Sequence, residues 1–146
     1  MSSSETLCNS PQFARIDATA DPATASAIRR EFSEWLHHHF ALDAAKECDV
    51  VLAVNEAMAN AAEYAYATAD RPGVMQVQAR YDGNAATLTV TIEDQGAWRT
   101  SDPGTRELKR GRGIPLMRAL ADEATVDTSP TGTRVSLAWT GVDAAR

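Results

Sequence analysis

Residues 75–92 of this 146-residue chain read MQVQARYDGNAATLTVTI, and this stretch decides the fold. Apolar and polar residues alternate over residues 75–81 and again over residues 86–92. Alternation with a period of two is typical of a β-strand that has one buried and one solvated face. The run of Asp, Gly and Asn at 82–84 predicts a hairpin loop between the two strands. The sequence therefore predicts an antiparallel sheet with one apolar face, which helices must cover.

Two helices are predicted before this hairpin. The first begins at Asp21-Pro22, a capping residue followed by proline at the first helical position, and ends near the three histidines at 37–39. The second covers about residues 43–66, where apolar residues recur at helical spacing. A short edge strand is predicted ahead of both, at residues 13–16. Consecutive histidines on a helix point about 100° apart, so we interpret the histidine run as a helix C-terminal turn and not as a metal site.

The chain after the hairpin is predicted to form a long loop, a helix and a strand pair. The loop covers residues 93–113, the helix residues 114–122, and the strands residues 124–128 and 133–140. A loop of about 20 residues is unusual in a compact domain and is generally a lid or a binding loop. With the first helices, these elements predict an α+β two-layer sandwich in which helices cover one face of a largely antiparallel sheet.

Length and composition indicate one globular domain. We predict a flexible N-terminus at residues 1–10, a single domain at residues 11–141 and a C-terminal tail at residues 142–146. The formal net charge of −6 argues against a nucleic-acid partner, which would need clustered Lys and Arg. No stretch approaches the roughly 18 apolar residues of a membrane span, and no signal pattern opens the chain. We therefore expect no membrane contact and a cytoplasmic location.

A candidate cation site lies on the predicted helix at 43–66. Glu56 and Asn60 are four residues apart and so lie one above the other, on the side that faces away from Val54 and Met58. A carboxylate and an amide oxygen in this arrangement can hold a hard cation and position a hydroxyl beside it. For the pair taken alone, a solvated helix face remains the alternative.

Two glycine-containing segments could bind the base and the phosphates of a nucleotide. The stretch Asp94-Gln-Gly96 ends the second strand of the hairpin, where the carboxylate could accept a hydrogen bond from an amine such as that of adenine; an ordinary turn is the alternative. Gly111-Arg112-Gly113 opens onto the predicted third helix, and free N–H groups at a helix N-terminus can hold phosphates. Neither the P-loop nor the dinucleotide fingerprint is matched.

The order and spacing of these segments resemble those of the GHKL ATPases, specifically the anti-sigma-factor serine kinases of the RsbW and SpoIIAB type. The resemblance covers about residues 13–140 and implies the Bergerat α/β sandwich. Residues 52–66, LAVNEAMANAAEYAY, resemble the family's N box. The remaining motifs are the first glycine box at residues 90–96, VTIEDQG, the second at residues 111–120, GRGIPLMRAL, and the closing motif Gly132-Thr133.

The resemblance implies a role for each candidate residue. Glu56 would be the general base, and Asn60 would be the Mg²⁺ ligand. Asp94 would recognise the adenine by accepting a hydrogen bond from its amine, and the hydroxyl of Thr133 would support the adenine pocket. Nucleotide contacts from the two glycine boxes would come from Gly96, Gly111, Arg112 and Gly113.

By the same resemblance the chain would bind ATP and Mg²⁺ and phosphorylate a serine or threonine of a STAS-type anti-anti-sigma protein. A sigma factor would be the alternating partner, and the assembly would be a homodimer. Phosphoryl transfer needs mainly positioning and charge neutralisation, which these residue types can supply. Two departures leave alternatives open, because Trp98 stands where the second glycine of its box is expected and Tyr64 where a histidine is common. The alternatives are a catalytically silent nucleotide-binding switch and a non-enzymatic interaction domain.

Further basic residues could contact partners or phosphates. Arg29 and Arg30 lie on the first predicted helix and could belong to a docking surface. Lys109 and Arg110 precede the second glycine box and could act as lid cations together with Arg112. For all of them a solvated surface remains the alternative.

Overall fold

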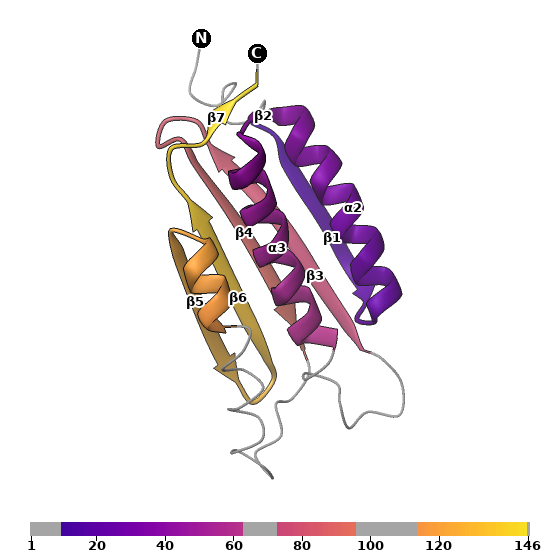
Figure 1. The fold of residues 1–146 in the computed structure, drawn as a ribbon. Helices are drawn as coiled ribbons and strands as arrows, with labels where there is room; N and C mark the ends of the chain where they lie inside the picture. Colours follow the sequence, from indigo (N-terminus) through magenta and orange to yellow (C-terminus); the bar gives the residue numbers. More distant parts are fainter. Residues whose placement is uncertain (1–9, 63–72, 96–113, 146) are drawn as a thin grey trace.

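The computed structural model describes residues 10–62, 73–95 and 114–145, and its central element is a five-stranded sheet (Figure 1). Neighbouring strands are antiparallel throughout, in the order β1-β3-β4-β6-β5. The strands are β1 (Gln12–Thr19), β3 (Val74–Asp82), β4 (Thr87–Asp94), β5 (Glu123–Ser129) and β6 (Gly132–Trp139). The predicted hairpin, the antiparallel sheet and the position of the first strand at an edge are confirmed.

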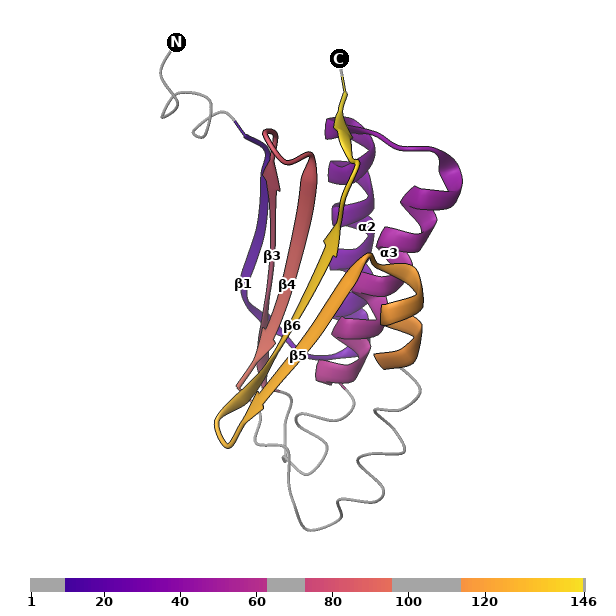
Figure 2. The same cartoon turned by 90° about the vertical axis from the view of Figure 1, so that its left-hand side faces the viewer.

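Helices cover one face of the sheet, and the described residues leave the other face open (Figure 2). The helices are α2 (Pro22–His39), α3 (Ala44–Asn60) and a short helix at residues 114–120. Asp21 and Asp43 cap the two long helices, and each Oδ1 accepts a 2.7 Å hydrogen bond from the backbone N–H three residues later. The predicted two-layer sandwich is therefore confirmed. None of the helices in the described ranges is long and apolar enough to span a membrane.

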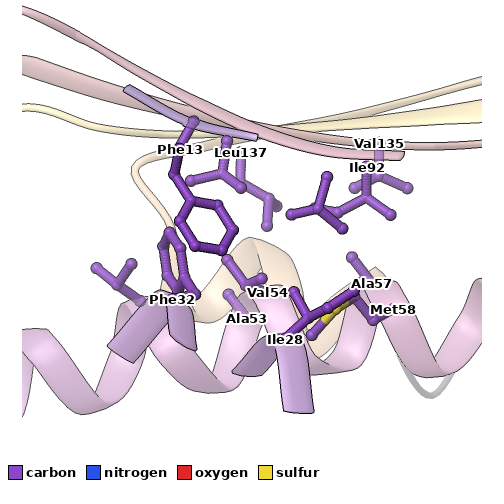
Figure 3. Close-up of a cluster of buried hydrophobic side chains, with 14 of the residues drawn as sticks. Phe13, Ile28, Phe32, Ala53, Val54, Ala57, Met58, Ile92, Val135 and Leu137 are labelled. Carbon is purple, nitrogen blue, oxygen red and sulfur yellow. The ribbon is translucent and has the colours of Figure 1, made fainter. Parts of the chain in front are cut away.

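Apolar side chains from the sheet and from both long helices meet in one core (Figure 3). Phe13 of β1 packs edge-to-face against Phe32 of α2, with ring centroids 5.5 Å apart. Val54 and Met58 of α3 extend toward the sheet, where Ile92 of β4 faces them. Burying a side chain of this size contributes roughly 1.5–3 kcal/mol, so the core fixes how α3 lies over the sheet.

The structure changes several predicted boundaries; β1 runs to Thr19 instead of residue 16, and the third helix ends at residue 120 instead of 122. Helix α3 is regular as far as Asn60 and continues for two residues with π-helical geometry, whereas the prediction extended it to residue 66 and residues 63–72 are not described. Ala86, predicted in a strand, belongs to the hairpin turn and has a positive φ of 51°. Glu93 and Asp94, predicted at the start of the loop, complete β4 because they pair with both neighbouring strands.

The end of the chain differs from the predicted C-terminal tail. Val142 is fully buried, and β7 (Asp143–Ala144) pairs with β2 (Phe40–Ala41) directly after α2. The hydroxyl of Tyr81 donates a 2.6 Å hydrogen bond to the carbonyl oxygen of Val142, which holds this segment against β3. Residues 142–144 therefore pack with the rest of the structure, and the boundary predicted at residue 141 falls inside it.

Candidate functional site

Four elements meet at the end of the sheet where β4 ends. The last turn of α3, the end of β4, the start of β6 and the first residues of the helix at 114–120 all lie there (Figure 1). Because β4 and β6 are antiparallel neighbours, Asp94 at the end of β4 lies directly opposite Thr133 near the start of β6. Asn60 is the last residue of α3. The fold thus brings together residues that are far apart in the sequence.

A small pocket lies between these elements. Asn60, Asp94 and Thr133 line it, and their exposed fractions are 8%, 7% and 5%. No other polar or charged residue in the described part of the chain is buried. Because burying polar side chains is costly unless they find partners, three of them around one pocket indicate a binding site. The rest of the lining is apolar and consists of Ala57, Ala61, Ile92, Ile114, Met117, Val126 and Val135.

Polar groups in this pocket remain available for a ligand. Thr133 Oγ1 is buried and has no hydrogen-bond partner among the described residues, and the side-chain amide of Asn60 forms no hydrogen bond with them. Asp94 already has an interaction within the protein. Buried polar groups are nearly always hydrogen-bonded, and leaving one unsatisfied costs about 1–3 kcal/mol. A ligand that hydrogen-bonds to Thr133 would remove this cost.

Gly132 allows β6 to begin close to the end of β4. A Cβ atom at this position would clash with the backbone carbonyl oxygen of Asp94 and crowd the Cα atom of Gln95. Glycine avoids this contact because it has no side chain. The residue therefore permits the close pairing that sets Thr133 opposite Asp94.

The pocket is nearly closed. Its volume is about 10 Å³, on the order of the space that one water molecule needs. Ile114 and Met117, from the helix at residues 114–120, form part of its wall. Asp94 and Thr133 also line a wider cavity of about 350 Å³ beside the β5–β6 hairpin. A ligand larger than water therefore requires the walls of the small pocket to move apart.

Glu56 lies one turn before Asn60 on α3, as predicted, but it does not line the pocket. Its side chain is half-buried and forms no hydrogen bond or ion pair with the residues that the structure describes. Its carboxylate can therefore accept a hydrogen bond or a proton from a group near the pocket.

The predicted orientation of Asn60 needs a correction. The sequence predicts that Asn60 faces away from the packed side of α3, but the residue is buried. Ala53 and Ala57, seven and three residues earlier, are also buried, so the packed face of the helix is wider than Val54 and Met58 alone indicate. Small alanine side chains let this part of α3 approach the sheet closely, which brings the Asn60 side chain inward.

Part of the predicted site lies outside the described residues. This applies to Gly96, Gly111, Arg112 and Gly113, to the candidate lid cations Lys109 and Arg110, and to Tyr64 and Trp98. Their roles stay predictions. Ile114, within the segment that resembles the second glycine box, directly follows Gly113 and lines the pocket, so the chain reaches the site at that point.

The sequence analysis missed the apolar walls of the pocket. Two of them had a local signal, because Ala57 lies three residues before Asn60 on one helix face and Ile92 lies two residues before Asp94 on one strand face. Met117 lies in the segment that resembles the second glycine box, but only the packing of its helix against the sheet brings it to the pocket.

Comparison with known proteins identifies the family. A family model described as the histidine kinase-like ATPase domain matches residues 18–139, a range that includes every residue lining the pocket. The chain belongs to this ATPase family. This chain is also similar to a crystal structure of the RsbU and RsbW domains of Rv1364c from Mycobacterium tuberculosis, with a TM-score of 0.70 and 25% identity. That match covers 93% of this chain and 34% of the other, so this chain spans about a third of the length of the protein it matches.

Family membership accounts for the fold and for the kind of ligand. The two-layer sandwich is the histidine kinase-like ATPase fold, of the RsbW type that the motifs resemble, and membership of the family implies ATP binding. The chemical character of the pocket suits an adenine base, because its walls are apolar and a few polar groups converge on it. The described residues include no cluster of three His, Cys, Asp or Glu side chains that could hold a metal. A Mg²⁺ ion commonly needs only one or two protein ligands beside phosphate oxygens, which is compatible with Asn60.

Proposed function

We propose that this chain is an ATP- and Mg²⁺-dependent serine/threonine protein kinase that acts as an anti-sigma factor. Its acceptor would be a serine or threonine of a STAS-type anti-anti-sigma protein, and a sigma factor that it sequesters would be its second partner; the assembly would be a homodimer. The observation that carries the proposal is the single pocket around the buried polar residues Asn60, Asp94 and Thr133. The family match and the similarity to a chain with an RsbW domain support this class of kinase.

The adenine base is proposed to bind between α3, β4 and β6. The carboxylate of Asp94 would accept a hydrogen bond from the exocyclic amine, and the base would satisfy the buried hydroxyl of Thr133. Apolar side chains such as Ile92 and Met117 would contact the faces of the ring. Since the pocket is nearly closed, the wall that includes Met117 and Ile114 would have to move outward for the base to enter.

The phosphates are proposed to lie beyond the last turn of α3. Mg²⁺, when bound, would neutralise charge on the phosphates during transfer. The side-chain oxygen of Asn60 would hold the ion beside the base pocket. Contacts with the phosphates from Gly96, Gly111, Arg112 and Gly113 are proposed from the family resemblance alone.

Glu56 is proposed as the general base. It lies one helical turn from Asn60, is half-buried and has no partner among the described residues. Its carboxylate would orient the acceptor hydroxyl and take its proton. The hydroxyl oxygen would bond to the γ-phosphorus while the bond to the oxygen of the leaving ADP breaks.

Nucleotide binding and phosphate transfer can be tested separately. Mg-ATP should raise the thermal midpoint of the wild type, because a ligand that binds only the native state stabilises it. With γ-labelled ATP and a STAS-type protein from the same genome, the wild type should label the acceptor. Glu56→Gln should keep the midpoint shift and lose roughly 100-fold or more of the transfer rate. Glu34→Gln, which changes an exposed carboxylate on α2, is the matched control and should keep both.

The outcomes distinguish the candidate functions. Transfer by Glu56→Gln at the wild-type rate would remove Glu56 from the mechanism. A midpoint shift without any transfer by the wild type would favour a catalytically silent nucleotide-binding switch, the alternative to which Trp98 and Tyr64 point. No midpoint shift with Mg-ATP would contradict nucleotide binding and favour a non-enzymatic interaction domain.

A further inference from the structure

The walls of the small pocket come from elements that differ in how firmly the fold holds them. Ile92 and Val135 belong to β4 and β6, and each of these strands is paired on both sides. Ala57 lies on α3, which packs into the core along most of its length. Met117, in contrast, belongs to the short helix at residues 114–120, which lies beside α3 over β5 and β6 (Figure 1). The short helix is therefore the wall that the rest of the fold holds least firmly.

Hydrogen bonds to the sheet hold the C-terminal end of this helix. The Nε1–H of Trp139 donates to the carbonyl oxygen of Leu120 at 2.8 Å. Directly after the helix, the backbone N–H of Asp122 donates to the carbonyl oxygen of Ala138 at 3.0 Å. Residues 114–117 form no hydrogen bond or ion pair with the sheet or with α3 among the residues that the structure describes. The first turn is thus held by packing, and the helix can open by swinging about its anchored end.

Met117 differs from the other apolar side chains of the wall. It is fully buried and is the only buried residue of the short helix. Methionine is unbranched and flexible, so it can repack around a ligand, whereas β-branched side chains are stiff at χ1 and alanine has no further atoms to move. All other apolar residues of the wall are alanine or β-branched, namely Ala57, Ala61, Ile92, Ile114, Val126 and Val135. Met117 is therefore the wall side chain that can change shape to admit a ligand.

We propose that Met117 controls how fast a nucleotide base enters the pocket and how large a base the pocket accepts. This inference rests on the proposed adenine site. The pocket has a volume of about 10 Å³, so the ring enters only when the short helix swings outward and Met117 gives up part of the space that it fills. Opening exposes a buried apolar side chain, which lowers the fraction of molecules ready to bind and slows association. Met117 is thus a specificity-determining residue, beside the polar recognition by Asp94 and Thr133.

Stopped-flow mixing with Mg²⁺ and ATP that carries a methylanthraniloyl label on its ribose measures the association rate. Met117→Ala should bind about tenfold faster than the wild type, because less apolar surface has to leave the core before the base enters. Met117→Ile keeps the bulk but stiffens the side chain, so it should bind severalfold more slowly. Met58→Ala is the matched control, since it truncates an equally buried methionine of α3 that does not line the pocket. It should associate at the wild-type rate.

Competition with N6-benzyl-ATP measures the size limit. This nucleotide keeps one N–H that can donate to Asp94 and adds a large apolar group at the edge of the ring. The wild type and Met58→Ala should bind it at least about tenfold more weakly than ATP, because the pocket has no room for the added group. Met117→Ala should reduce this preference for ATP severalfold, whereas Met117→Ile should keep it.

Several results would overturn the proposed role of Met117. These are association of Met117→Ala at or below the wild-type rate, an equal gain in Met58→Ala, and an unchanged preference for ATP in Met117→Ala. Each of them would leave the proposed nucleotide site in place, because the wild type would still bind labelled ATP. Failure of the wild type to bind labelled ATP would contradict both the nucleotide site and the role of Met117.

Discussion

The two ends of the sheet differ in the hydrogen bonding of their buried polar groups, although the same strands form both ends. Where β6 ends, the Tyr81 hydroxyl donates to the carbonyl oxygen of Val142 at 2.6 Å, and the Nε1–H of Trp139 donates to the carbonyl oxygen of Leu120 at 2.8 Å. Where β6 begins, the buried hydroxyl of Thr133 has no partner in the described chain. One end is closed by internal hydrogen bonds, whereas the other has a buried hydroxyl without a partner among the described residues.

We therefore expect residues at one end of the sheet to contribute mainly to stability and residues at the other end to contribute mainly to ligand binding. A buried polar group with a partner supports the fold, whereas a group without one lowers stability and persists where a ligand makes use of it. Substitutions at the closed end should lower the free energy of unfolding and leave nucleotide binding intact below the transition. Substitutions at the open end should weaken nucleotide binding with little loss of stability.

Trp139→Ala should give the largest effect and test the closed end. Trp139 is 2% exposed, so truncation leaves a large cavity and removes the hydrogen bond to Leu120. We expect a loss of about 3–5 kcal/mol in the free energy of unfolding, measured by urea denaturation. Mg-ATP should still raise the midpoint of the variant. A loss below about 1 kcal/mol would show that this end is not the stable one.

Asp94→Asn tests the open end. The substitution keeps the shape of the side chain and removes the charge that would bind the exocyclic amine, and hydrogen bonds to charged groups contribute about 1.5–3 kcal/mol. We expect ATP to bind roughly 10- to 100-fold more weakly, measured by calorimetric titration. Asp49→Asn, a half-buried aspartate of α3 outside the pocket, is the control. Unchanged ATP affinity in Asp94→Asn would refute the adenine-binding role.

Tyr81→Phe should have a smaller effect at the closed end. It removes the hydrogen bond to Val142, so we expect a loss of about 1 kcal/mol in the free energy of unfolding. Burial raises the pKa of Tyr81, and the nearby carboxylates of Asp143 and Asp82 raise it further. Because the folded-state pKa is the higher one, the stability linked to it is fully present below the unfolded pKa of about 10 and is lost as the pH rises through the folded-state pKa.

Urea denaturation of both proteins over a pH series measures this contribution. The difference in the free energy of unfolding between the wild type and Tyr81→Phe should be constant near neutral pH and should become smaller above about pH 10. The other tyrosines are present in both proteins and cancel in the comparison. A difference that widens above that pH would contradict the assigned cause of the raised pKa.

Thr133→Val should have the smallest effect on stability, and it tests most directly whether the two ends of the sheet differ. Removing a buried hydroxyl that has no partner should change the free energy of unfolding by less than about 1 kcal/mol, and could raise it. ATP should bind about two- to tenfold more weakly, as for one neutral hydrogen bond. Thr125→Val, at an exposed position of β5 that lines neither cavity, should leave affinity unchanged. A clear loss of stability in Thr133→Val would mean that its hydroxyl has a structural role.

Most of the fold could be predicted from local sequence signals. The alternation over residues 75–92 predicted the hairpin, and the cap at Asp21 predicted where the first long helix begins. These signals are reliable because they depend on one strand face or one helix turn. The C-terminal residues were predicted wrongly, since the burial of Val142 depends on contacts with distant elements and leaves no periodic signal in five residues.

For the candidate site, the motifs named three polar residues that line the pocket but did not predict how their side chains lie. Asn60, Asp94 and Thr133 could be named from the sequence because each belongs to a motif with a characteristic residue type. That Asn60 is buried depends on the close approach of α3 to the sheet, which its alanines permit. The walls supplied by Met117 and Val126 depend on packing between elements that the sequence places far apart.

The sequence by itself determined the elements, their order and the chemical types at the site, because periodicity and capping are local properties of the chain. Only the tertiary structure decided that the three buried polar side chains share one pocket. This arrangement arises where separate elements pack together, and burial and pairing are defined only once those neighbours are in place.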